Sequence, residues 1–241
     1  MQLESIRVAL RPRTVWEGCD LGVRLLQASH RTVYRNHLLV MLPLSALLLA
    51  TVEIADWLPM LLLWLCKPWL DRTLLFCLSR ALFGEETRAA DLWAAARSVW
   101  GGQWLRTFTL ARLSASRAFT APVVQLEGLA GRDLRKRLDV LATRRRGTAR
   151  LMTQMFATAE LSIYLSLLIV PAWLTPTAVA TTWSMASITH VGPFLAALAY
   201  VLAVFFVEPF YVAAGFGMYI NRRVELEAWD VEQEFRRAFA A

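Results

Sequence analysis

Positive charge is missing from a long part of this sequence. Between Arg150 and Arg222 there is no lysine or arginine, and the only acidic residues are Glu160 and Glu208. The whole chain of 241 residues is 57% hydrophobic and has a mean hydropathy of +0.43, which is too apolar for an ordinary soluble domain. The composition therefore predicts helices that span a membrane.

Histidine and cysteine are also scarce, with three of each. The cysteines form no CxxC pair and fall in segments that we place in the cytoplasm or the bilayer, so we predict neither a disulfide nor a zinc site. The histidines have no carboxylate or cysteine at ligand spacing, and the sequence shows no Ser/His/Asp or HxxxD-like arrangement. We therefore expect no metal, no cofactor and no catalytic residues.

The first apolar region is predicted to form a hairpin. Residues 38–54 are a run just long enough to cross a bilayer, and the next run, 57–83, is interrupted by the charged stretch CKPWLDR. If 38–66 were one span, the next region, with its 13 basic residues, would lie outside, against the positive-inside bias. A hairpin with its tip at 54–59 keeps that region inside. A re-entrant hairpin that does not reach the far side remains an alternative.

The second apolar region predicts another hairpin, with one span at 152–174 and its return at 193–220. We thus expect an all-α polytopic membrane bundle of about four spans, with both termini in the cytoplasm. The expected segments are an amphipathic helix at 1–36, a hairpin at 37–83, a basic cytoplasmic region at 84–150, a hairpin at 151–221 and an acidic amphipathic helix at 222–241.

Amphipathic and cytoplasmic helices are expected outside the spans. Thr14 and Glu17 form a capping box that predicts a helix beginning near Val15, either lying in the headgroup layer or packed on the protein itself. In the basic region, glycines divide the chain into short helices, and the stretch 114–131 reads as an irregular connector that contains Pro122. The expected short helices are 91–100, 103–113 and 131–146.

Charged residues lie inside the apolar regions, and two of them, Lys67 and Glu208, precede a proline. An ion at the centre of a membrane helix costs about 2.5 to 3.5 kcal/mol, so these groups must face one another or water. We predict an intramembrane polar cluster of Lys67, Asp71, Arg72, Glu160 and Glu208. With three acids and two cations, one acid would be protonated or a water would enter. The cluster is either a proton or ion relay or polar substrate site, or structural glue that fixes helix register.

Two further surfaces are candidates for binding. A net-basic run is predicted to contact anionic inner-leaflet lipids or a partner, unless it only holds the loop inside, and no nucleic-acid module accompanies it. Its basic residues are Arg132, Arg135, Lys136, Arg137, Arg144, Arg145, Arg146 and Arg150. The C-terminal helix has an apolar face containing Val224, Val231 and Phe235 among acids, which we expect to dock onto the protein's own basic region or onto a partner.

Three segments carry a resemblance to known proteins: LSRALFGE, APVVQLEGLAG and VEPFYVAAGFGMYINRRVELEAWDVE. Along most of its length the chain resembles uncharacterised multi-pass inner-membrane proteins of Gram-negative bacteria, often encoded beside a transglutaminase-like membrane protein, a von Willebrand A-domain protein and an AAA+ ATPase. Its end resembles, more distantly, the membrane domain of some glycerophosphodiester phosphodiesterases. The resemblance implies a component of an envelope-associated membrane assembly and carries no catalytic motif.

These observations lead to one main functional expectation and two alternatives. The chain is expected to be a non-enzymatic scaffold or anchor subunit of a membrane complex, with membrane-protein partners or further copies of itself. The first alternative is a transporter or proton-coupled component that uses the intramembrane charges. The second is a lipid-acting membrane enzyme whose site is assembled in space.

Overall fold

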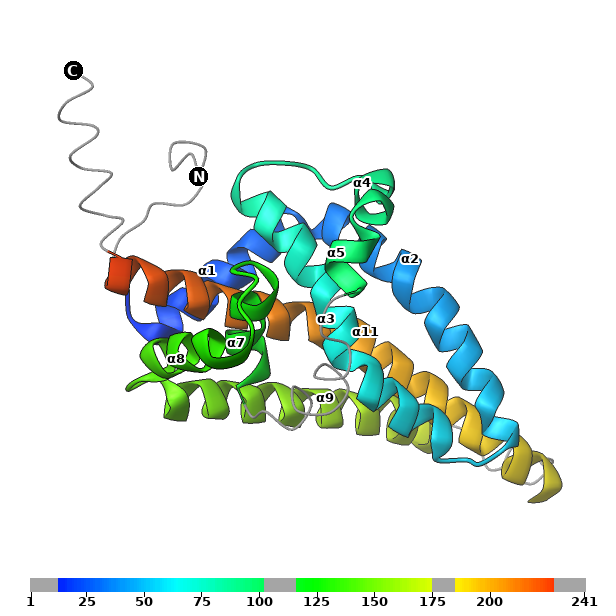
Figure 1. The fold of residues 1–241 in the computed structure, drawn as a ribbon. Coiled ribbons are helices and arrows are strands. Elements are labelled where there is room, and N and C mark those ends of the chain that lie inside the picture. The colour runs from blue at the N-terminus through cyan, green and yellow to red at the C-terminus, as the bar shows by residue number, and fades with distance from the viewer. Residues whose placement is uncertain (1–12, 102–115, 175–184, 228–241) are drawn as a thin grey trace.

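The computed structural model describes residues 13–101, 116–174 and 185–227 (Figure 1). This part of the chain is helical and contains no strand, so the all-α prediction is confirmed. The elements are α1 (Val15–Ala28), α2 (His30–Leu49), the 3-10 turn η2 (Ala50–Glu53), α3 (Leu58–Leu82), α4 (Ala89–Ala94), α5 (Ala96–Trp100), α7 (Arg117–Gln125), α8 (Gly131–Ala142), α9 (Arg146–Leu174) and α11 (Met185–Glu227).

Four long helices run side by side and set the shape of the molecule (Figure 1). Helices α2 and α3 form an antiparallel hairpin joined by η2, and α9 and α11 run antiparallel to each other. The turn of the first hairpin, the end of α9 and the start of α11 lie at the same end of the bundle, while α1, α7 and α8 lie at the other. The short helices therefore pack around one end, where the basic residues are concentrated.

Three of the long helices are long and apolar enough to cross a membrane, so the expected count of about four spans was too high. They cover His30–Glu53, Arg146–Pro171 and Gly192–Glu227 of the described residues, and they indicate a membrane protein. Helix α3 has 25 residues, about 37 Å of helix, but Lys67, Asp71 and Arg72 near its middle lower its hydropathy. It returns the chain along α2 to the end at which α2 began.

The N-terminal helix α1 packs against the last part of α11. The predicted capping box is present, since Thr14 accepts from the Glu17 N–H at 3.3 Å while the Glu17 carboxylate accepts from the Thr14 N–H at 3.2 Å. A Cβ built on Gly22 would overlap the backbone of Ala213 and approach that of Gly217. Such contact is possible only between glycine-bearing surfaces, so of the two placements left open for this helix, the structure shows packing on the protein.

The basic region folds differently from the prediction in one place. The stretch expected to be an irregular connector contains helix α7, even though Pro122 lies inside it. Phe119 and Val123 of α7 are buried in the core shared with α11, and this packing outweighs the backbone hydrogen bond that a proline removes. Helix α8 begins at Gly131 as predicted but ends at Ala142. The helix expected at 103–113 lies outside the described residues.

The close packing of α1 on α11 predicts a size limit at Gly22. A Gly22→Ala substitution should lower the free energy of unfolding by about 1 to 3 kcal/mol, because overpacking outweighs the roughly 0.5 to 1 kcal/mol that alanine adds to a helix. Gly147→Ala is the control, since a Cβ there meets nothing within 4 Å, and it should leave stability unchanged or slightly raised. Thermal unfolding in mild detergent measures both; equal midpoints would contradict the close contact.

Candidate functional site

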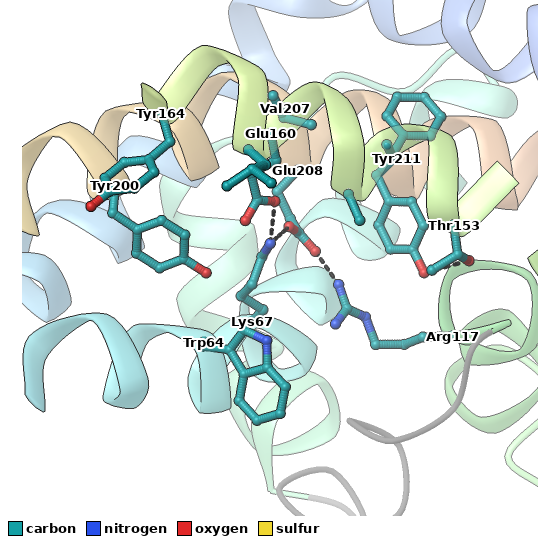
Figure 2. Close-up of a pocket in the computed structure, with 13 residues that line it drawn as sticks. Trp64, Lys67, Arg117, Thr153, Glu160, Tyr164, Tyr200, Val207, Glu208 and Tyr211 are labelled. Atoms are coloured by element: carbon teal, nitrogen blue, oxygen red, sulfur yellow. Dashed lines mark hydrogen bonds and ion pairs between the residues drawn. The ribbon is translucent and has the colours of Figure 1, made fainter. Parts of the chain in front are cut away.

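The acidic and basic side chains of the bundle interior form one ion-pair network. Lys67, near the middle of α3, places its Nζ 2.7 Å from Oε2 of Glu208 on α11, and it also pairs with Glu160 on α9. Figure 2 shows the Lys67 side chain reaching between the two carboxylates. One lysine thus joins three helices of the bundle. Its two carboxylate partners compensate the cost of burying a charge among apolar helices.

The second cation of the network is Arg117, the first residue of α7. Its Nε lies 2.8 Å from Oδ2 of Asp71, and its Nη2 pairs with Glu208 from the side opposite Lys67. Asp71 follows Lys67 by one helical turn, so α3 directs both residues toward the same interior. The carboxyl groups of Asp71 and Glu208 are almost completely buried, with 1% of each residue exposed. Glu208 therefore bridges the two cations and is the centre of the network.

Arg117 is held by more than its ion pairs. Its guanidinium lies over the Tyr211 ring, with Cζ 5.1 Å from the ring centroid, and the Tyr211 hydroxyl accepts a hydrogen bond from the Ala118 N–H at 3.2 Å. Burial disfavours the charged guanidinium, but Asp71 and Glu208 outweigh this effect and raise the pKa of Arg117 above its ordinary value. The side chain is thus a fixed positive charge.

The sequence predicted Arg72 in this cluster, and the described ion pairs of the cluster contain Arg117, which the sequence had not placed there. Arg72 directs its Nη1 to the carbonyl of Val99 at 3.3 Å. Arg117 was assigned to the basic region on composition alone. A signal for its position exists, because in a helix it shares a face with Ala121 and Val124, four and seven residues later, and a lone arginine on such an apolar face requires a buried partner.

The network carries one excess negative charge. Lys67 and Arg117 oppose Asp71, Glu160 and Glu208, so two cations face three carboxylates and the formal sum is minus one. A buried uncompensated charge is costly, so one proton or a solvating water is required. Glu160 is the most accessible member, with 14% of its side chain exposed.

A cavity of about 290 Å³ opens beside the network between α3, α9 and α11 (Figure 2). Besides Lys67, Glu160 and Glu208, it is lined by Tyr164 and Tyr200, whose rings meet edge to face at 5.9 Å. These groups suit water or a small polar molecule that carries a proton. The described residues contain no group of three or more His, Cys, Asp or Glu side chains that could hold a metal ion.

The predicted basic run divides into paired and exposed residues. Three of its members form ion pairs within the chain: Arg137 with Glu127 and Glu227, Arg145 with Glu225, and Arg146 with Asp139. Hydrogen bonding to Glu127 and Glu227 raises the pKa of Arg137. The other five are exposed: Arg132, Arg135, Lys136, Arg144 and Arg150. Only these five remain fully available to a lipid surface or a partner.

The described part of the C-terminal face docks onto this protein's own chain. Val224 is buried in the core with 2% exposed. It therefore packs within this chain and does not form a docking site for a partner. Glu225 and Glu227 pair with the basic region through Arg145 and Arg137, which was one of the two placements left open for this helix. The other two predicted docking residues, Val231 and Phe235, lie outside the described residues.

The network predicts unequal roles for two arginines. Arg117→Met should lower the free energy of unfolding by about 3 to 5 kcal/mol, because it leaves Asp71 and Glu208 buried with too little positive charge. Arg72→Met leaves the ion pairs of the network in place and should cost less than Arg117→Met. Denaturation from mixed micelles measures both, and adding Asp71→Asn to Arg117→Met should restore part of the loss. Equal effects of the two arginine variants would refute the pairing.

Comparisons with models of protein families, with curated proteins and with solved structures give no significant match. The resemblance to multi-pass inner-membrane proteins therefore stays a prediction.

Proposed function

We propose that this chain is a non-enzymatic integral membrane protein that anchors or scaffolds a membrane complex. Its interior supports a structural role, because Glu208 and Lys67 each pair with two oppositely charged groups and hold α3, α7, α9 and α11 in one register. Buried pairs of this kind fix an arrangement of helices more than they add net stability. What such an anchor needs in addition is a surface for another membrane helix.

The observation that carries this proposal is the open flank of α9. None of the most apolar 18-residue stretch of α9 is buried in the structure, although α9 contacts α3 through the Glu160–Lys67 ion pair and α11 through Tyr164 and Tyr200. Its large exposed residues include Leu161, Ile163, Leu165, Leu167, Ile169 and Val170. A spanning helix with so little of its surface covered by the described residues has room for both lipid and a second protein.

One line of this flank has the composition of a helix contact. Thr158, Ser162 and Ser166 follow each other at intervals of four, are exposed, and lie about opposite the side that carries Glu160. The Thr158 and Ser166 hydroxyls donate to the backbone carbonyls four residues earlier, at 3.0 and 2.8 Å. These side chains are therefore small, and their hydroxyl donors need no partner on another helix. Small residues at this spacing allow membrane helices to approach closely.

The placement in a bacterial inner membrane with both termini inside is part of the same proposal. Arg13 at the start of α1 exchanges two hydrogen bonds with Asn221 near the end of α11, at 3.0 and 2.9 Å, so both ends of the described chain lie together at the arginine-rich end. The turn between α2 and α3 contains Glu53 and Asp56 and no basic residue. The positive-inside bias then favours a cytoplasmic location for the arginine-rich end.

The proposal predicts an assembly that depends on the line of small residues on α9. In native mass spectrometry from mild detergent, the protein should appear with further copies or a bound membrane protein. Ser162→Trp should reduce the assembled fraction severalfold by preventing close approach. Ile163→Trp, about 100° around the same helix, is the matched control and should assemble normally. A solitary monomer for the unaltered protein would contradict the scaffold proposal.

A second candidate, a proton-coupled membrane component, is favoured by the excess carboxylate at the edge of the cavity. Glu160 pairs with Lys67 and lines the 290 Å³ cavity, so it connects the network to that space. This arrangement is compatible with either role of the network and can be tested at one residue.

Glu160→Gln and Glu208→Gln separate the two functions. Glu160→Gln leaves two cations facing two acids, so its stability should stay within about 1 kcal/mol, whereas Glu208→Gln removes the bridge between Lys67 and Arg117 and should cost about 3 kcal/mol or more. Proton flux into proteoliposomes under a pH gradient is the functional measurement. If the unaltered protein shows a flux that Glu160→Gln abolishes, the second candidate replaces the scaffold; without such a flux, the network is structural.

A further inference from the structure

We propose that a second cavity, between α3, α7, α8 and α9, binds the phosphate group of an anionic ligand. The cavity has a volume of about 640 Å³ and lies against Arg117, which also lines the first cavity. Five arginines line it: Arg72, Arg117, Arg135, Arg146 and Arg150. This inference goes beyond the proposed scaffold function, because the cavity would hold its ligand whether or not the protein assembles.

The charge in the cavity is strongly unbalanced. Against the five arginines stand only Asp71 and Asp139, so the formal sum is plus three. Both acids are engaged, Asp71 with Arg117 and Asp139 with Arg146. For Arg135 and Arg150, no ion pair is found among the described residues. The cavity therefore presents unneutralised guanidinium groups to whatever enters it, and an anion is the ligand that this charge favours.

The kind of cation and the form of the space favour a phosphate. Guanidinium groups bind phosphate oxygens through two parallel N–H bonds, which gives arginine an advantage over lysine at such sites. The volume lies within the range of about 300 to 1,000 Å³ that is usual for ligand sites. Ala121, Val124 and Leu138 supply apolar wall, which suits a phosphate joined to a carbon skeleton.

One unsatisfied group points to a ligand with hydroxyls. Gln125 lines the cavity, and its Nε2 donates to the carbonyl of Arg72 at 2.8 Å, which fixes the orientation of the amide. The Gln125 Oε1 is buried and accepts no hydrogen bond from the described residues. A buried acceptor of this kind calls for a donor, and a water or a hydroxyl of a glycerol-type headgroup would provide one beside the phosphate.

The position of the cavity fits the headgroup layer of a membrane. Helix α9 begins at Arg146, and its first turns, with Arg146 and Arg150, lead into a candidate span. The arginine-rich end of such a span lies at the level of lipid phosphates. The phosphate can thus come from an anionic phospholipid of the adjoining leaflet or from a free phosphate compound in water, and the chemistry of recognition is the same for both.

The experiment compares two double variants that remove equal charge. Arg135→Gln with Arg150→Gln removes two cations from the cavity, while Arg132→Gln with Lys136→Gln removes two exposed cations that do not line it. All four residues are exposed, so both proteins should fold. Native mass spectrometry of the full chain measures retention of phosphatidylglycerol and phosphatidylcholine, and thermal unfolding measures stabilisation by phosphatidylglycerol and by inorganic phosphate.

The unaltered protein should retain phosphatidylglycerol about tenfold or more over phosphatidylcholine, and the cavity variant should lose that preference while the control keeps it. Stabilisation by millimolar inorganic phosphate that the cavity variant loses would identify a soluble phosphate as ligand; stabilisation by phosphatidylglycerol alone would identify a lipid. Equal losses in both variants would mean diffuse attraction of a basic surface and would overturn the proposal, as would the absence of any response to both anionic probes.

Discussion

The structure depends on the neutralisation of one buried carboxylate, that of Glu208. Glu208 is almost completely buried in a helix long and apolar enough to cross a membrane, where an isolated charge would be too costly. Its two oxygens are neutralised from two sides, by Lys67 of α3 and by Arg117 of α7. The requirement to neutralise the Glu208 carboxylate explains why α7 packs into the bundle. It also explains why α3 has charged residues near its middle and still packs inside the bundle.

Much of the fold could be predicted because its signals are local. The capping box at Thr14 predicted the start of α1, and the apolar runs located the four long helices, although α2, α9 and α11 begin six to eight residues before the predicted runs. The span count was overestimated, because α3 was counted as a span from its length, whereas Lys67, Asp71 and Arg72 near its middle lower its hydropathy. The length of α3 was visible in the sequence; the neutralisation of its charges depends on residues far along the chain.

The candidate site was predicted in part, and the errors have a common cause. Charge and depth identified Lys67, Glu160 and Glu208, but the second cation was assigned to Arg72, the nearest one in sequence. Arg117 was hidden in a segment read as a solvent-side connector, because Pro122 and the surrounding glycines outweighed the apolar face of α7. Packing of Phe119 and Val123 against α11 places α7 in the bundle. Such packing between segments about ninety residues apart leaves no local signal in the sequence.

Arg117 separates the two cavities, and its pairing decides which residues can act in each. Because Asp71 and Glu208 already neutralise its guanidinium, an anion entering the larger cavity gains little from Arg117. It must be held by Arg135 and Arg150, which form no ion pair with any residue that the structure describes. A small polar molecule in the other cavity meets the excess carboxylate of Glu160 instead. The network therefore divides one interior into a basic side and an acidic side, and Arg117 lies between them.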